Sequence, residues 1–106
     1  MAFADNLKQL PAVTHLAALQ LLNTDTVGEV VAIIENVPDK TGSLTVYASL
    51  AAKHGSINVA AAQEGLVMFA EHTEDARDHP GIHPNIDRLL DVLSTGKSLS
   101  TKLINA

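Results

Sequence analysis

The chain of 106 residues has no cysteine and no tryptophan, and aromatic residues make up only 3% of it. The absence of cysteine excludes disulfide frameworks, thiolate zinc sites and cysteine nucleophiles. It fits a reducing compartment, and the first ten residues lack the basic start and apolar run of a signal peptide, so we expect a cytoplasmic protein. Unbroken apolar runs, such as residues 30–34, are too short to span a bilayer, so we expect no membrane partner.

Apolar residues, in contrast, are plentiful at 46% of the chain, and charged residues make up 18%. A sequence this rich in aliphatic side chains is not typical of a disordered protein. The chain has the length of one domain, which should bury about 65% of the surface that its unfolded form exposes. We therefore expect a single domain over residues 1–106 with a core of many small aliphatic contacts.

The net charge of -5 is concentrated in one part of the chain. Between residues 64 and 91, seven acidic residues face two arginines, whereas the acids and bases of the remaining chain balance. The same stretch contains three of the five histidines, which are His72, His79 and His83. An evenly spread charge would bear on solubility alone, but a local one marks this stretch as a candidate functional region.

Residues 50–61 have the helix–glycine turn–helix spacing of a DNA-binding motif, but the charge does not suit that role. The second helix would have to contact bases and phosphates, yet residues 56–76 contain no lysine or arginine. Because the acids there would repel phosphates, we expect no nucleic-acid partner.

The first third of the chain predicts a short helix at 3–10 and a β-hairpin at about 13–37. Residues 13–22 and 27–37 are apolar and partly β-branched, and the turn-forming sequence 23–26 separates them. Because both faces of these strands are largely apolar, we expect the sheet to be covered on both sides.

Helices dominate the prediction for the rest of the chain. Residues 44–54 fit a strand or a helix, and their alanines together with Gly55, a suitable C-cap, favour a helix. Ser56 or Asn58 can cap a second helix at 59–76.

A third helix is predicted to begin at Pro84 with Asn85 as its N-cap and Asp87 in its first turn, and to end at Gly96. The tail at 98–104 fits an edge strand or a partner-docking arm. The order of the elements predicts an α+β fold, in which a small antiparallel sheet packs against three or four helices.

The acidic and histidine-rich segment 71–85 is the candidate functional site of the protein. Imidazole and carboxylate are the usual ligands of zinc, iron or manganese when thiols are absent. Pro80 and Pro84 break the helix and stiffen the loop, which would preorganise a site, and Arg77 is the candidate for binding an anion or substrate. The candidate metal ligands are His72, Asp75, His79 and His83, with Glu71 as an alternative carboxylate.

The same features also have a purely structural interpretation. Histidine is favoured near helix C-termini by the helix dipole, and an acidic helix flank is usually a solvated face. Of the two other histidines, His15 is expected to be partly buried in the first strand, with a role as ligand or base as the alternative, and His54 is expected to cap a helix end.

Residues 71–77 (EHTEDAR) and 79–90 (HPGIHPNIDRLL) resemble the marker segments of a small bacterial family of uncharacterised proteins, a domain of unknown function. The likeness extends to Asn6-Leu7 and to the turns at 42–44 and 55–57, and so to nearly the whole chain. It implies a bacterial, cytosolic, single-domain protein and assigns no activity to any residue.

Two functions from different classes fit these features. The first is a homo-oligomeric binding or interaction module, most simply a homodimer, whose site at 71–85 takes a small anionic ligand or a basic protein partner. The alternative is a divalent-metal-binding protein or a small metal-dependent enzyme that uses His72, His79 and His83. A metal site requires these three imidazoles to converge on one ion at a bond length of ~2 Å.

Overall fold

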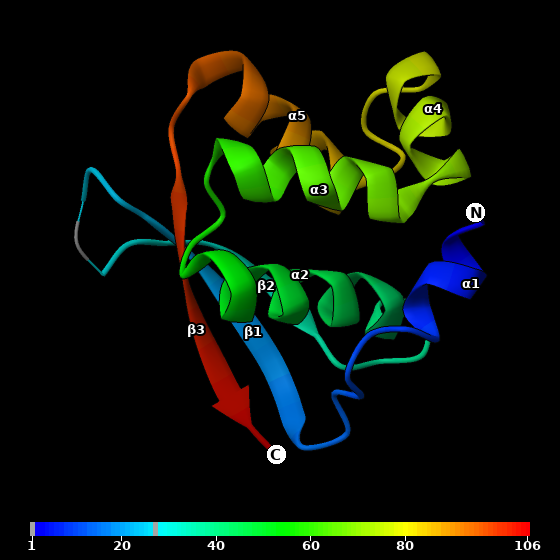
Figure 1. Ribbon diagram of the computed structural model, residues 1–106. Coiled ribbons are helices and arrows are strands. Elements are labelled where there is room, and N and C mark those ends of the chain that lie inside the picture. Colours follow the sequence, from blue (N-terminus) through cyan, green and yellow to red (C-terminus); the bar gives the residue numbers. More distant parts are fainter. Residues whose placement is uncertain (1, 27) are drawn as a thin grey trace.

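A hairpin, a run of helices and a returning strand make up the chain, in the α+β arrangement that the sequence predicts (Figure 1). The computed structural model describes residues 2–26 and 28–106. In chain order the elements are α1 (Phe3–Leu7), β1 (Leu16–Asn23), β2 (Val30–Glu35), α2 (Thr41–His54), α3 (Val59–Phe69), α4 (Glu71–Asp78), α5 (Pro84–Thr95) and β3 (Leu99–Asn105).

The sheet has three antiparallel strands in the order β2-β1-β3. In the central strand, Leu19 lies opposite Ile34 of β2 and Leu103 of β3. The predicted hairpin is confirmed as β1 and β2, although the predicted start of its second strand, Val27, falls outside the described residues. The C-terminal tail is an edge strand, which was one of the two predictions for it.

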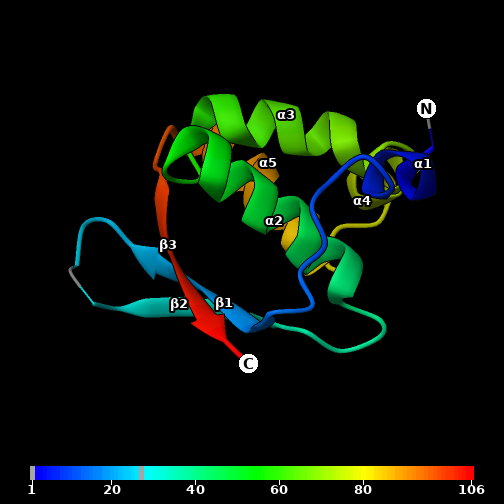
Figure 2. The ribbon, with the colours of Figure 1, turned by 60° about the horizontal axis from the view of Figure 1, so that its bottom comes forward.

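All five helices of the described chain lie on one face of this sheet (Figure 2). Leu19, Leu21 and Ile34 point into the core on that face and are buried, whereas Ile33 on the other face is 52% exposed. The prediction that the sheet is covered on both sides is therefore wrong for a single chain. The reason is topological, because the helices α2 to α5 form one continuous segment that leaves β2 and returns to β3 over the same face.

Helix α2 confirms the helical interpretation of residues 44–54, and α3 packs closely beside it. Gly55 ends α2 in the left-handed conformation (φ 78°), and the Asn58 side chain caps α3 by accepting a hydrogen bond from the Ala61 N–H at 2.8 Å. In α3, a Cβ atom on Gly65 would lie 2.8 Å from a methyl carbon of Leu89. The glycine therefore permits the close approach of α3 and α5.

The predicted helix at 59–76 is wrong, because it breaks at Ala70 into α3 and α4. Ala70 has a positive φ of 50° with ψ at -117°, and its N–H bonds to Val67 instead of Leu66. The Thr73 hydroxyl donates a hydrogen bond of 2.6 Å to the Leu66 carbonyl. Because a buried side chain replaces the missing backbone donor, the break leaves this carbonyl satisfied.

The start of α5 also differs from the prediction. His83, not Asn85, occupies the N-cap position, and Pro84 is the first helical residue, where its missing N–H costs nothing. Asp87 lies in the first turn as predicted, and its carboxylate accepts a hydrogen bond from the Gly81 N–H at 2.9 Å. This contact closes the short connection between α4 and α5.

The two histidines outside this region have different surroundings. His15 precedes β1 in a turn and is exposed, so the prediction of a partly buried strand residue is wrong. His54 ends α2 as predicted, and its Nε2 lies 3.3 Å from Glu64, which also pairs with Lys53 at 2.7 Å. None of the helices in the described ranges has the length and apolarity needed to cross a bilayer.

Candidate functional site

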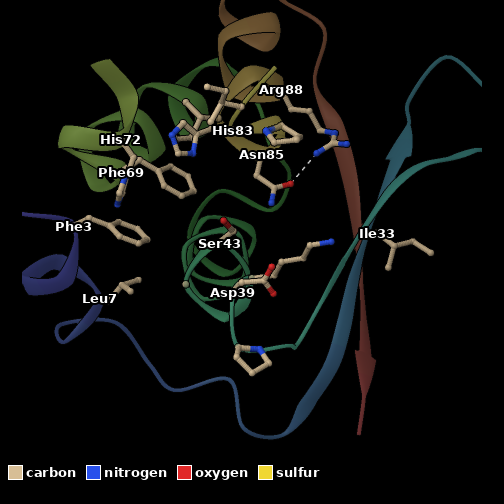
Figure 3. A pocket seen from close by; sticks show the side chains of 16 residues that line it. Phe3, Leu7, Ile33, Asp39, Ser43, Phe69, His72, His83, Asn85 and Arg88 are labelled. Carbon is tan, nitrogen blue, oxygen red and sulfur yellow. Dashed lines mark hydrogen bonds between the residues drawn. The ribbon is translucent and has the colours of Figure 1, made fainter. Parts of the chain in front are cut away.

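A cleft of about 660 Å³ opens where four distant segments of the chain meet: α1, the segment from Ile33 of β2 to the start of α2, the junction of α3 with α4, and the start of α5 with the loop before it (Figure 3). Its lining includes aromatic, basic and amide side chains, among them Phe3, Phe69, His72, His83, Asn85 and Arg88. Phe3, Leu7 and Phe69 gather on one side, and Arg88 with Asn85 lies on the other, as Figure 3 shows.

Helix α1 forms the apolar side of the cleft because several contacts hold it there. The backbone N–H of Phe3 donates to the Glu71 carboxylate at 2.8 Å, and the Asn6 amide donates to the Met68 carbonyl at 3.0 Å. The hydrogen bond from Phe3 holds the pKa of Glu71 below its usual range. Gly42 at the start of α2 makes room for α1, since a Cβ there would lie 3.1 Å from the Phe3 ring.

An aromatic row runs from this wall towards the imidazoles. The rings of Phe3 and Phe69 are stacked with their centroids 5.3 Å apart. His72 meets Phe3 edge-on at 5.1 Å and lies 5.5 Å from the ring of His83. Both of these imidazoles line the cleft. The lining of the cleft therefore changes along this row from apolar phenyl rings to polar imidazoles.

Asp75 is the partner of two histidines. Its Oδ2 lies 2.7 Å from Nε2 of His83, and its Oδ1 lies 3.2 Å from Nδ1 of His79. The hydrogen bond from His83 is the main reason why the pKa of Asp75 lies below its usual range. Because a carboxylate can only accept, Nε2 of His83 carries a proton, which fixes the orientation of an imidazole that lines the cleft.

The basic side of the cleft is built on the first turns of α5. The Tyr47 hydroxyl, buried in the core, donates a hydrogen bond to the backbone carbonyl of Asn85, and burial raises the pKa of Tyr47 far above its usual range. The guanidinium of Arg88 donates to the side-chain oxygen of Asn85 at 2.7 Å. Within the described residues Arg88 has no ion pair, although Asp39 also lines the cleft.

Most of the predicted site residues lie close together in the structure, but only some of them line the cleft. His72 and His83 line the cleft, Asp75 supports His83 from outside the lining, and His79 is largely exposed beyond it. Arg77 is exposed on α4 and does not line the cleft. Among residues 2–26 and 28–106, no three histidine or carboxylate side chains form a group that could hold a metal ion.

Sequence reasoning missed both cationic residues that line the cleft, Arg88 and Lys40. In the sequence Arg88 is only one of two bases in an acidic stretch, because nothing local separates it from Arg77. One signal was present, since Asn85 and Arg88 are three residues apart on a helix that begins at the His-Pro loop. Phe3 and Tyr47 carried no such signal, because their roles depend on contacts with distant segments.

Comparison with known sequences gives the family. Residues 3–103 match the family described as an uncharacterised protein conserved in bacteria (DUF2322). The chain belongs to this family. The matched range includes every residue of the cleft and confirms the resemblance found in the sequence. No curated protein and no solved structure matches the chain significantly, so the chemistry of the site rests on its own geometry.

Proposed function

We propose that the protein is a cytosolic binding module whose cleft takes a small organic anion, a molecule with an acidic head group and an apolar body. The observation that carries the proposal is Arg88, a guanidinium that lines the cleft and has no ionic partner among the described residues. A cation in a partly desolvated cleft attracts an anion more strongly than one on the open surface.

The head group would bind at Arg88. The hydrogen bond from Arg88 to Asn85 holds one guanidinium nitrogen in place, which lowers the entropic cost of ligand binding. A guanidinium suits carboxylate and phosphate because its planar donors match two acceptor oxygens. His72 lines the same cleft and can donate a further hydrogen bond to an acidic group.

The body of the ligand would lie on the apolar side. Phe3 and Phe69 offer a stacked pair of rings, and Ile82, which is 60% exposed, lies at the same cleft. A cleft of about 660 Å³ lies in the size range of small-molecule sites. A ligand that covered Ile82 would gain the free energy of removing its apolar surface from water.

A direct test is to titrate the protein with phenylacetate and phenyl phosphate, with neutral phenylacetamide as the matched ligand, and to follow amide and imidazole signals by NMR. We expect the acids to shift the signals of His72, His83 and Arg88 and the amide to bind more weakly. Arg88→Gln should weaken binding of the acids by roughly tenfold or more. Arg77→Gln is the control, because it removes the same charge outside the cleft, and equal losses in both variants would contradict the proposal.

Divalent-metal binding is the second candidate function, and one observation favours it. His79 and His83 both point a ring nitrogen at the carboxylate of Asp75, at 3.2 and 2.7 Å. Imidazole and carboxylate are ligands of zinc, iron or manganese, so a rearrangement that brings these three side chains around one ion would form a site, and such a site could serve a metal-dependent enzyme. Calorimetric titration with each metal tests it, with His79→Ala/His83→Ala as the variant that should lose the heat of binding. No heat in the wild type removes this candidate and leaves the anion proposal in place.

A further inference from the structure

The helices leave one face of the sheet open (Figure 2). Leu19, Leu21 and Ile34 point towards the helices, so alternation along each strand places their neighbours on the other face. By the register of the strands, that outer face consists of Ala18, Gln20 and Leu22 of β1, Val30, Ile33 and Glu35 of β2, and Ser100, Lys102 and Ile104 of β3, and Val31 is the extra residue at the irregularity of β2.

Apolar side chains surround the central Gln20 on the outer face. Ile33 and Val30 on the edge strand β2 are 52% and 42% exposed, and Leu22 and Ile104 are partly exposed. β-branched side chains on an open sheet face are typical of a surface that packs against another sheet.

The two charges of this face lie on opposite edges. Glu35 is on β2, in the row of Ala18 and Ile104, and Lys102 is on β3, in the row of Gln20 and Ile33. Two strand spacings, about 10 Å, separate the edges. Within the residues that the structure describes, neither Glu35 nor Lys102 forms an ion pair.

We propose that this face is the interface of a homodimer, in which the outer faces of two sheets pack together about a two-fold axis parallel to β1. That rotation places β2 of each chain over β3 of the other and keeps the position along the strands. Glu35 would then lie one row from Lys102 of the partner subunit, within reach of both side chains, and the symmetry would repeat the pair.

The charges of Glu35 and Lys102 favour a second copy of the chain as the partner and a two-fold axis parallel to the strands. A two-fold axis perpendicular to the strands would place β2 over β2 and each charge over the edge of its own sign. A basic protein would pair with Glu35 but would repel Lys102, whereas a second copy satisfies both. Because three short strands offer a small area, we expect a weak dimer that dissociates on dilution.

Sedimentation equilibrium over a range of concentrations tests the proposal. The wild type should show a monomer–dimer equilibrium, and Ile33→Asp should raise the dissociation constant by roughly tenfold or more. Ile33→Thr keeps a β-branched side chain and should weaken the dimer in the same direction without harming the strand. A monomeric wild type at every concentration, or a dimer that both variants leave unchanged, overturns the proposal.

Charge reversal tests the proposed axis. Glu35→Lys and Lys102→Glu should each weaken the dimer, and the double variant should restore it, because the two pairs re-form with their signs exchanged. Asp91→Lys, at an exposed position of α5, makes the same change of net charge as Glu35→Lys and should leave the dimer as it is. A double variant as weak as the two single ones overturns this arrangement. Arg88 is outside this face, but Ile33 also lines the cleft, so the anion titration is read only in proteins that keep Ile33.

Discussion

Nε2 of His83 donates a hydrogen bond of 2.7 Å to the carboxylate of Asp75, across the turn that joins α4 to α5. The two residues are eight positions apart. Pro80 lies between them in the sequence, and Pro84 directly follows His83. His83 has a φ of -119° and a ψ of 80°, outside the helical region, as expected for a residue before proline. The backbone thus turns the imidazole towards α4, and the carboxylate holds it there.

This hydrogen bond should lower the acid titration midpoint of Asp75. We expect the pKa of Asp75, followed by NMR of its side-chain carbonyl carbon, to lie below the ordinary 3.8 and to rise towards it in His83→Ala. His79→Ala should raise it less, because His79 contributes less than His83. Since the folded state binds this proton more weakly than the unfolded state, the stabilisation is present above pH ~4 and is lost as the pH falls through the lowered pKa. A midpoint at or above 3.8 in the wild type would show that the contact does not form in solution.

The break between α3 and α4 should be relieved by glycine. Ala70 has a φ of 50° and a ψ of -117°, a conformation that strains a residue with a Cβ atom. Ala70→Gly should therefore raise the free energy of unfolding by about 1 kcal/mol, measured by urea denaturation. The matched change Ala52→Gly, at an exposed position inside α2, should lower it by about 0.5–1 kcal/mol. If both substitutions destabilise equally, Ala70 is not strained.

The sequence predicted the elements whose signals are local. The hairpin followed from apolar, β-branched runs around a polar turn, and the C-terminus of α2 followed from Gly55. The break at Ala70 has no local signal, because an alanine inside an apolar helical pattern favours continuation. It forms because Thr73 reaches back to the Leu66 carbonyl and α1 anchors Glu71.

The candidate site was predicted in its location but not in its composition. Two of the predicted histidines line the cleft, and Asp75, another candidate ligand, contacts His79 four residues further along the chain. The cleft itself needs α1, which lies more than 60 residues away in sequence from its partner Glu71. Local patterns in one sequence contain no information on such long-range contacts. The places of Arg88 and Phe3 in the cleft could therefore be recognised only from the structure.

Tyr47 should support the basic side of the cleft through its hydroxyl group. It is fully buried and donates to the Asn85 carbonyl, so Tyr47→Phe leaves a carbonyl without its partner. The free energy of unfolding should fall by about 1–3 kcal/mol, measured by chemical denaturation. Thr95→Val removes an exposed hydroxyl that bonds to the Asp91 carbonyl and should change stability by less than about 0.5 kcal/mol. Equal effects of the two changes would mean that the buried hydrogen bond contributes little.

Glycine should be required at position 65 because its neighbours leave no room for a Cβ atom, and not because of its backbone conformation. An added Cβ would lie 2.8 Å from a methyl carbon of Leu89 and 2.9 Å from one of Leu50, and both leucines are fully buried. Overpacking of this kind costs about 1–3 kcal/mol, whereas alanine gains about 1 kcal/mol over glycine inside a helix. Because two side chains would have to move at once, we expect the overpacking to win, so Gly65→Ala should lower the free energy of unfolding by about 1 kcal/mol.

A double-mutant cycle separates these two effects. Leu89→Ala alone should destabilise by about 2–5 kcal/mol, because it opens a cavity in the core. In that background Gly65→Ala meets one obstructing methyl group fewer, so its cost should shrink by about 0.5 kcal/mol or more. If Gly65→Ala stabilises the wild type by the full helix-propensity difference, α3 and α5 are not packed this closely. If its cost is the same in both backgrounds, contact with Leu89 is not its cause.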